Sequence, residues 1–160
     1  MADRAPHVHI AVDDPRRADV QRLLERHLAF AYANSPREHV HALDVDRLID
    51  PTITFFSARD AGGVLLGVGA LKEIDAEHGE IKSMHTAELA RRAWVGGAML
   101  RHIVKVARER SYTGLSLETG IGPVFAAAQS LYKRAGFTEC EPFGEYTRNP
   151  HSVCMTMSLR

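Results

Sequence analysis

Histidines are the residues whose spacing first suggests chemistry in this chain of 160 amino acids. His7 and His9 lie two positions apart, as do His39 and His41, so each pair points to one side of an extended segment. No carboxylate or cysteine joins either pair at a spacing typical of zinc ligands. We therefore expect no metal site, and we expect His39 and His41 to belong to a solvated loop.

The cysteines and the charges indicate the setting in which the chain works. Cys140 and Cys154 lie in strand-like segments and form no C-x-x-C motif, which favours two buried, reduced thiols in a cytoplasmic protein over a disulfide. Twenty Lys and Arg residues balance 20 Asp and Glu residues, which argues against a nucleic-acid or acidic-membrane partner. Residues 1–6 lack the apolar run of a signal peptide, and no run approaches the ~18 apolar residues of a membrane span, so we expect a soluble protein.

The periodicity of apolar residues predicts the elements that must position any site. It indicates the order strand, two helices, three strands, helix, strand, helix, two strands. The expected strands cover residues 7–12, 52–59, 64–71, 80–86, 114–119, 137–146 and 153–159. The expected helices follow an N-cap at Asp13-Asp14-Pro15, begin near Asp44, and cover residues 98–110 and 123–135.

This order predicts an α/β (α+β) fold in a single domain over residues 1–160. Three consecutive strands in the middle of the chain are expected to form an antiparallel meander. The strand–helix–strand unit that follows predicts one parallel pair in an otherwise antiparallel sheet. Where such a sheet splays, a groove opens that can hold a ligand.

Three stretches of the second half carry a family resemblance. They are KSMHT at 82–86 followed by ARRAWVGGAML at 90–100, then LSLETG at 115–120, then AQSLYKRAGF at 128–137, which matches an A-x-x-L-Y-x-x-x-G-F ending. Together they resemble the GNAT superfamily of N-acetyltransferases, best over 81–137 and more loosely along the whole chain. The tail from Cys140 to Tyr146 resembles a bacterial branch of small, little-characterised members. The resemblance implies a mixed, mostly antiparallel sheet of about seven strands with helices on both faces.

The resemblance also implies acetyl-CoA as co-substrate, without a metal. In the family, a splayed strand pair forms the CoA groove, the strand matching 80–86 runs beside the pantetheine arm, and the next loop binds the pyrophosphate. Backbone N–H groups at a helix start attract anions, and glycines let the backbone approach them closely. The implied cofactor-binding residues are Met84, His85, Thr86, Arg91, Arg92, Ala93, Trp94, Val95, Gly96, Gly97 and Ala98.

The phosphate loop departs from the family's R-x-x-G-x-G/A pattern. Arg91 and Gly96 match it, whereas Arg92 and Trp94 occupy positions usually held by glycine. A shifted register would keep Gly96 and Ala98 but lose the arginine. We expect the Trp94 side chain to point away from the phosphates, toward solvent or the adenine, and Arg92 to compensate with charge-assisted hydrogen bonds.

Acid–base roles follow from the same resemblance. Tyr132 matches the tyrosine that protonates the departing CoA thiolate, a role that suits a phenol hydroxyl, although the residue could instead be a core tyrosine. Glu80 lies where many members carry the base that deprotonates the amine, and Glu118 is the second candidate. Each glutamate could also be a surface carboxylate paired with a lysine or arginine. No cysteine lies where a covalent acetyl carrier is expected, which favours direct transfer in a ternary complex.

The sequence therefore predicts a cytoplasmic, acetyl-CoA-dependent N-acetyltransferase that acts on an amine of a small molecule or on an exposed amino group. A non-catalytic acyl-CoA or small-ligand binding module on the same fold is the main alternative, because the phosphate loop departs from the pattern. A plain interaction domain is the third. The residues do not name the acceptor, since acceptor pockets are built from variable loops. The Met-rich last strand could pair across a homodimer.

Overall fold

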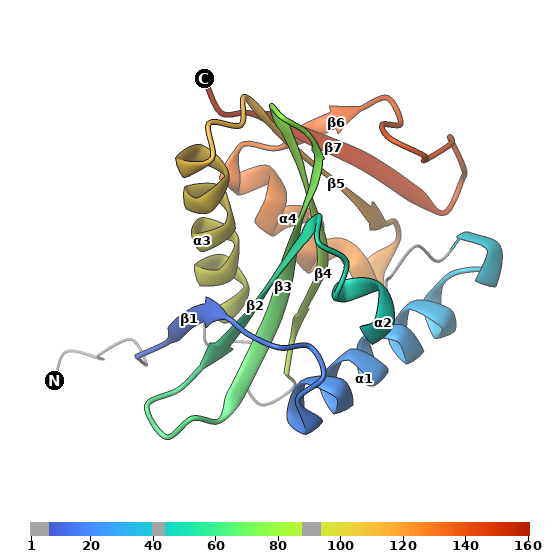
Figure 1. Cartoon of the computed structure of the whole chain (residues 1–160). Coiled ribbons are helices and arrows are strands. Elements are labelled where there is room, and N and C mark those ends of the chain that lie inside the picture. Colours follow the sequence, from blue (N-terminus) through green and yellow to red (C-terminus); the bar gives the residue numbers. More distant parts are fainter. Residues whose placement is uncertain (1–6, 40–43, 88–93) are drawn as a thin grey trace, which may run out of the picture.

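One mixed sheet of seven strands organises the chain, as predicted. The computed structural model describes residues 7–39, 44–87 and 94–160. The strands are β1 His9–Val12, β2 Ile53–Arg59, β3 Leu65–Asp75, β4 His78–Thr86, β5 Gly114–Gly120, β6 Thr138–Cys140 and β7 Ser152–Ser158. The helices are α1 Ala18–Asn34, α2 Val45–Leu48, α3 Val95–Glu109 and α4 Ala126–Ala135, with short 3-10 turns at Arg37–His39 and Pro123–Phe125. Figure 1 shows these elements.

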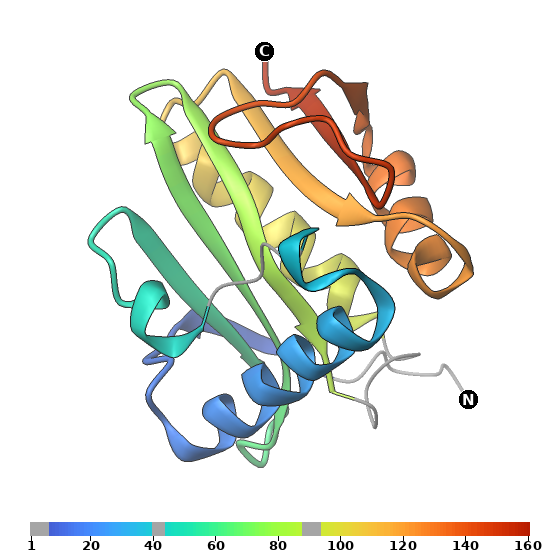
Figure 2. The same ribbon diagram turned by 90° about the vertical axis from the view of Figure 1, so that its right-hand side faces the viewer.

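The sheet has the order β1-β2-β3-β4-β5-β7-β6, and β4–β5 is its parallel pair. This confirms the predicted parallel pair within an otherwise antiparallel sheet. The pairing joins His78–Ile81 of β4 to Gly114–Leu117 of β5 and ends there, although both strands continue. In Figure 2, β5 (orange) turns away from β4 (yellow-green) beyond this point. The splay expected between these two strands is therefore present.

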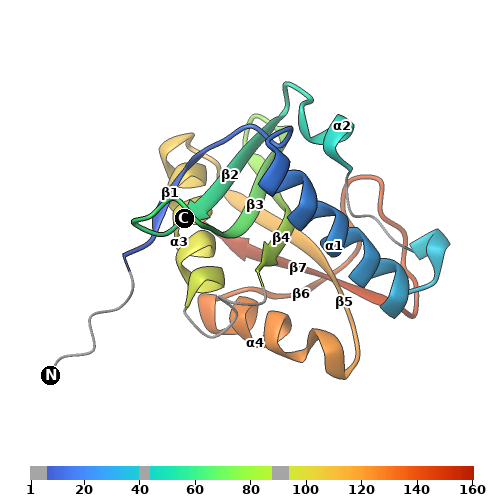
Figure 3. The ribbon, with the colours of Figure 1, turned by 90° about the horizontal axis from the view of Figure 1, so that it is seen from below.

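Helices cover both faces of the sheet, and each face has its own core. The larger cluster lies between the sheet and α3 and α4, and includes Phe56, Ile103 and Phe137, each at most 2% exposed. The smaller cluster lies between the sheet and α1 and α2, around Leu24 and Phe55. Figure 3 shows α1 on the side of the sheet opposite α3 and α4. No helix in the described part of the chain is both long and apolar enough to cross a bilayer.

The start of α1 differs from the prediction. The helix begins at Ala18, after an N-cap at Arg17 whose side chain makes no capping bond. Asp13, expected to cap the helix, instead accepts hydrogen bonds from Ser57 Oγ at 2.6 Å and from the Arg59 guanidinium at 3.1 Å. The carboxylate is used for tertiary contacts because β2 brings a buried hydroxyl and a guanidinium within its reach.

The last two strands also correct the prediction. The segment expected to be a strand over 137–146 pairs only over Thr138–Cys140, and the chain then leaves the sheet. The last strand, β7, lies between β5 and β6 rather than at an edge, so it cannot pair freely across a homodimer as suggested. Cys140 and Cys154 face each other across β6–β7, and both are free thiols.

Arg59 links β2 to the start of α1 and should contribute to stability. Its guanidinium, 13% exposed, donates to Asp19 at 2.6 Å as well as to Asp13. We expect Arg59→Met to lower the free energy of unfolding by about 1.5–3 kcal/mol, the worth of hydrogen bonds to a charged group. Urea unfolding measures this loss. The matched control is Arg16→Met, which breaks an ion pair with Asp14 whose two side chains are 65% and 45% exposed, and it should change little.

The loss caused by Arg59→Met should depend on pH. Hydrogen bonding to Arg59 lowers the pKa of the Asp19 carboxyl. A folded-state pKa below the unfolded value gives stability that is present above the unfolded value and lost as the pH falls through the folded one. The gap between variant and parent should therefore close below about pH 4, where an unfolded Asp takes up its proton. A gap that stays constant into acid would contradict this account.

Candidate active site

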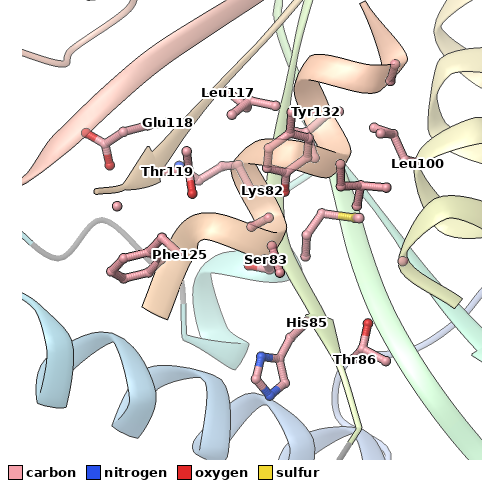
Figure 4. A pocket seen from close by; sticks show the side chains of 18 of the residues that line it. Lys82, Ser83, His85, Thr86, Leu100, Leu117, Glu118, Thr119, Phe125 and Tyr132 are labelled. Atoms are coloured by element: carbon pink, nitrogen blue, oxygen red, sulfur yellow. The ribbon is translucent and has the colours of Figure 1, made fainter. Parts of the chain in front are cut away.

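A cavity of about 1370 Å³ opens where β4 and β5 separate. Its walls come from β4 and β5, from α1 on one face of the sheet, from α3 and α4 on the other, and from the segment between β6 and β7. Figure 4 shows side chains from several of these elements around the cavity. The cavity thus crosses the sheet at the gap, and a molecule in it can be contacted from both faces.

A bulge in β4 sets the directions of the side chains along this gap. The register of β3 against β4 shifts around Ser83, which has a φ of 56°. Before the bulge, Ile81 belongs to the core on the α3 side, so Glu80 and Lys82 point to the opposite face. After the bulge, Met84 packs on the α3 side again. Polar side chains therefore collect on the α1 side of the gap.

The first turn of α3 presents backbone donors at one end of the cavity. Trp94 is the N-cap, with a φ of 63° in the left-handed region, and no described side chain caps the helix. The Ala98 N–H donates to the Trp94 carbonyl, so the N–H groups of Val95, Gly96 and Gly97 have no partner within the helix. These donors and the helix dipole favour an anion.

Two glycines, Gly96 and Gly97, line this end of the cavity. A Cβ on Gly96 would lie 3.5 Å from the Leu131 side chain, and one on Gly97 would lie 3.3 Å from the Arg101 guanidinium. Arg101 therefore adds a cation beside the free backbone donors. Trp94, which also lines the cavity, is 70% exposed. The donor set fits a phosphate group of a nucleotide-like ligand.

The structure brings most of the expected cofactor-binding residues to the cavity. Those that line it are Met84, His85, Thr86, Trp94, Gly96 and Gly97. Val95 is buried in the core and Ala98 lies within the first turn of α3. Arg91, Arg92 and Ala93 lie outside the described residues, so the compensation expected from Arg92 remains a prediction.

Tyr132 projects from α4 into the cavity (Figure 4). It is 7% exposed, and its ring packs edge-on against Phe137 with 5.9 Å between centroids. Burial raises the pKa of the Tyr132 hydroxyl to about 12, so the hydroxyl keeps its proton at neutral pH. The residue combines core packing with a place in the cavity wall, and it can act there as a proton donor.

Glu80 is the centre of a buried polar network on the other side of the gap. Its Oε2 accepts a hydrogen bond from the Tyr146 hydroxyl at 2.5 Å and pairs with Lys82 Nζ at 3.1 Å. Lys82 Nζ also donates to the Tyr146 hydroxyl at 2.6 Å. Burial and the Glu80 carboxylate raise the pKa of Tyr146, so its hydroxyl remains a donor. The glutamate is thus fixed rather than free at the surface.

Lys82 and Tyr146 were not among the expected site residues. Lys82 could have been found, because two positions along a strand return a side chain to the face of Glu80. Tyr146 is 66 residues from Glu80 in the sequence and lies in the segment after β6 that was expected to be strand. That segment instead folds back over the sheet, where Phe143 packs against Tyr146 with 5.1 Å between ring centroids. No local pattern signals this contact.

Glu118 brings a second carboxylate to the same cavity from β5. Its Oε2 accepts a hydrogen bond from Ser152 Oγ at 3.1 Å, and Ser152 Oγ accepts one from Asn149 Nδ2 at 2.9 Å. The charge of Glu118 also contributes to raising the pKa of Tyr146. Both candidate bases therefore lie near one tyrosine.

Two histidines form part of the α1 wall. His27 Nδ1 and His85 Nδ1 lie 3.3 Å apart, so one of them carries the proton that the other accepts. Burial lowers the pKa of His27 to about 4, which keeps it neutral. Within the described ranges, no group of three or more His, Cys, Asp or Glu is arranged to hold a metal.

Comparisons with known proteins agree with this geometry. The model of the acetyltransferase (GNAT) family matches residues 19–137. YsnE of Bacillus subtilis (strain 168), an uncharacterised N-acetyltransferase, is 45% identical over 152 residues, which cover 95% of this chain and all of the relative.

Solved structures show the same fold. A crystal structure from Klebsiella pneumoniae, assigned by its name to the acyl-CoA N-acyltransferases, is 27% identical with a TM-score of 0.81 and covers 96% of this chain and 98% of that one. A GNAT family acetyltransferase from Elizabethkingia anophelis, solved with acetyl-CoA bound, is 18% identical with a TM-score of 0.69 and covers 94% and 97%. The chain therefore belongs to the GNAT family and is an N-acetyltransferase.

Proposed function

We propose that the protein transfers the acetyl group of acetyl-CoA to an amine of a small molecule or to an exposed amino group, by direct attack in a ternary complex. The observation that carries the proposal is the cavity through the sheet. It has backbone anion donors at one end and an acid and carboxylates on its walls. Release of free thiol from acetyl-CoA with a panel of amines tests it, and a protein that releases none with any amine would leave the non-catalytic binding module.

Acetyl-CoA supplies the activated acetyl group, and the chain supplies the groups that hold it. We place the pantetheine arm along Met84–Thr86, in the gap that β5 leaves open. The N–H groups of Val95, Gly96 and Gly97 and the Arg101 guanidinium would hold the pyrophosphate. The related structure from Elizabethkingia anophelis with acetyl-CoA bound supports this choice of co-substrate.

The acceptor would enter from the α1 side of the sheet, where the polar groups collect. Phe30 of α1 and Phe125 pack edge-on with 5.6 Å between ring centroids and line this part of the cavity with Glu118. An amine with an apolar body fits such a wall, because the rings bury carbon and the carboxylate attracts the ammonium. These contacts would select for an apolar body and a positive charge, but not for one particular amine.

Once the amine is neutral, the side chains that line the cavity account for each bond and proton in the proposed reaction. The amine nitrogen forms a bond to the thioester carbonyl carbon, and the carbon–sulfur bond breaks. The bound ammonium first loses one proton to solvent, which leaves the neutral amine that attacks. Its nitrogen then gives a second proton to Glu80, directly or through water, and Tyr132 donates its proton to the departing sulfur. The Oε1 atom of Glu80 suits this uptake, since the bonds from Lys82 and Tyr146 both go to Oε2 and no other described residue donates to Oε1. Glu118 is the alternative base.

Tyr132→Phe should lower kcat strongly, by about 10²–10⁴-fold, because the sulfur then leaves without its acid. The dissociation constant for CoA should stay near that of the parent, since the hydroxyl acts mainly in the transition state. Steady-state kinetics and calorimetric CoA binding measure the two quantities. The matched control is Tyr112→Phe, a buried tyrosine away from the cavity, which should keep its activity. If Tyr132→Phe were as active as Tyr112→Phe, Tyr132 would have a packing role only.

Glu80→Gln should also lower kcat by about 10²–10⁴-fold if this glutamate takes the amine proton. The amide keeps the size of the side chain and can still accept the bond from Tyr146, so folding should be preserved. Glu118→Gln serves as the comparison and should affect acceptor KM more than kcat. The reverse result, a large kcat effect only in Glu118→Gln, would transfer the role of base to Glu118.

Trp94→Gly should stabilise the protein and leave CoA affinity unchanged. A non-glycine residue in the left-handed region costs about 1–2 kcal/mol, which glycine avoids. Because the indole is 70% exposed, its loss should not remove a phosphate contact. Trp94→Ala, which keeps the strain and removes the ring, separates the two effects in thermal unfolding and in CoA titration. Weaker CoA binding in both variants would show that the indole contacts the cofactor.

A further inference from the structure

Ser83 combines two costly features at the point where β4 leaves β5. Its φ of 56° lies in the left-handed region, which residues with a side chain rarely adopt. Its Oγ is buried and is the one side-chain oxygen or nitrogen in the described residues that is buried without a hydrogen-bond partner. The residue as a whole is 7% exposed and lines the cavity.

The bulge accounts for the backbone conformation, but the fold does not explain why the residue there is a serine. A buried hydroxyl without a partner loses its hydrogen bonds to water and forms none in the protein. Alanine at this position would therefore give a more stable folded state. A bulge that needs a positive φ would be less strained with glycine at that position. Strained backbone and unpaired polar groups cluster at functional sites, where a ligand supplies what the free protein lacks.

The surroundings indicate which atom of a ligand could meet the hydroxyl. Ser83 comes two residues after the last β4 residue paired with β5, so it lies at the inner end of the gap. Its neighbours along β4 are Lys82, which belongs to the Glu80 network, and Met84, where the proposed path of the pantetheine arm begins. Tyr132, on α4, lines the same cavity. Ser83 therefore lines the same cavity as the groups proposed to act on the amine and on the sulfur.

We infer that the Ser83 hydroxyl donates a hydrogen bond to the carbonyl oxygen of the acetyl thioester. This inference rests on the proposed function, and it assigns a residue to the one reacting atom that Tyr132 and Glu80 do not serve. As the amine attacks, the carbonyl oxygen gains negative charge, which the Oγ–H stabilises. When the carbon–sulfur bond breaks, the electron pair on that oxygen re-forms the carbonyl double bond. The charge leaves with the sulfur, which Tyr132 protonates, and Ser83 neither gains nor loses a proton.

Burial makes this single donor effective. A hydrogen bond to a charged oxygen is stronger where water is excluded, and the strained backbone fixes the donor before the substrate arrives. Because the hydroxyl is already desolvated in the free protein, no further desolvation of this group is needed during the reaction. The same argument predicts that the acetyl group contributes to binding, because free CoA lacks the thioester carbonyl to which Ser83 would donate.

The test is Ser83→Ala, measured three ways. The variant should unfold at a urea concentration no lower than the parent, because it loses only an unpartnered hydroxyl. Its kcat with acetyl-CoA should fall by about 10²–10³-fold, the usual effect of removing one such donor. The parent should bind acetyl-CoA more tightly than CoA by calorimetry, and the variant should lose that preference. Ser83→Gly should lose kcat equally while gaining stability from the relieved φ.

Ser111→Gly is the matched control. Ser111 has a φ of 64° and does not line the cavity, so glycine there relieves the same strain away from the site. It should gain stability and keep the kcat of the parent. A Ser83→Ala variant with parental kcat and an unchanged preference for acetyl-CoA would overturn the inference, as would one that loses stability together with activity. A parent that binds acetyl-CoA but acetylates no amine would refute the proposed function, and the binding preference would still decide the role of Ser83.

Discussion

The early end of the pairing between β4 and β5 is the constraint on which the site depends. Backbone hydrogen bonds hold neighbouring strands about 4.8 Å apart, so no ligand can enter a continuous sheet. Here the parallel ladder stops at Ile81 and Leu117, while the strands run on to Thr86 and Gly120. The bulge at Ser83 and the start of α3 both lie along the edge exposed in this way. The cavity, the anion donors and the acid–base groups all lie along that opening.

The architecture could be predicted because local patterns carry it. Alternation of apolar residues predicted each strand, and the change from an antiparallel meander to a strand–helix–strand unit predicted the parallel pair. The failures have a common cause in long-range contacts. Asp13 and Asp14 have the composition of a helix cap, but Arg59 and Ser57 on another strand draw Asp13 away. Residues after Cys140 were predicted to continue the strand, but Phe143 and Tyr146 pack onto the sheet instead.

The candidate site was predictable to a similar degree. Motif spacing pointed to Tyr132, Glu80 and the glycines of α3, and the structure brings these to one cavity. The partners that fix Glu80 were not found, because Tyr146 reaches it through a loop whose course depends on tertiary packing. The backbone conformation at the site could not be predicted from the sequence either. Nothing in the letters around Ser83 shows that this residue adopts a positive φ, although Trp94 could be suspected where a glycine is usual.

The cavity is lined from both faces of the sheet, and this has a kinetic consequence. In the proposed placement, acetyl-CoA lies toward α3 and α4 and the amine lies toward α1, so neither reactant needs to pass the other on its way in or out. The architecture itself then imposes no obligatory sequence of arrival or departure. Any ordering would have to arise from energetic coupling between the occupants across the gap, such as one of them adjusting the strand edge that both contact. The sheet separates the two reactants except at the gap between β4 and β5, where they would meet.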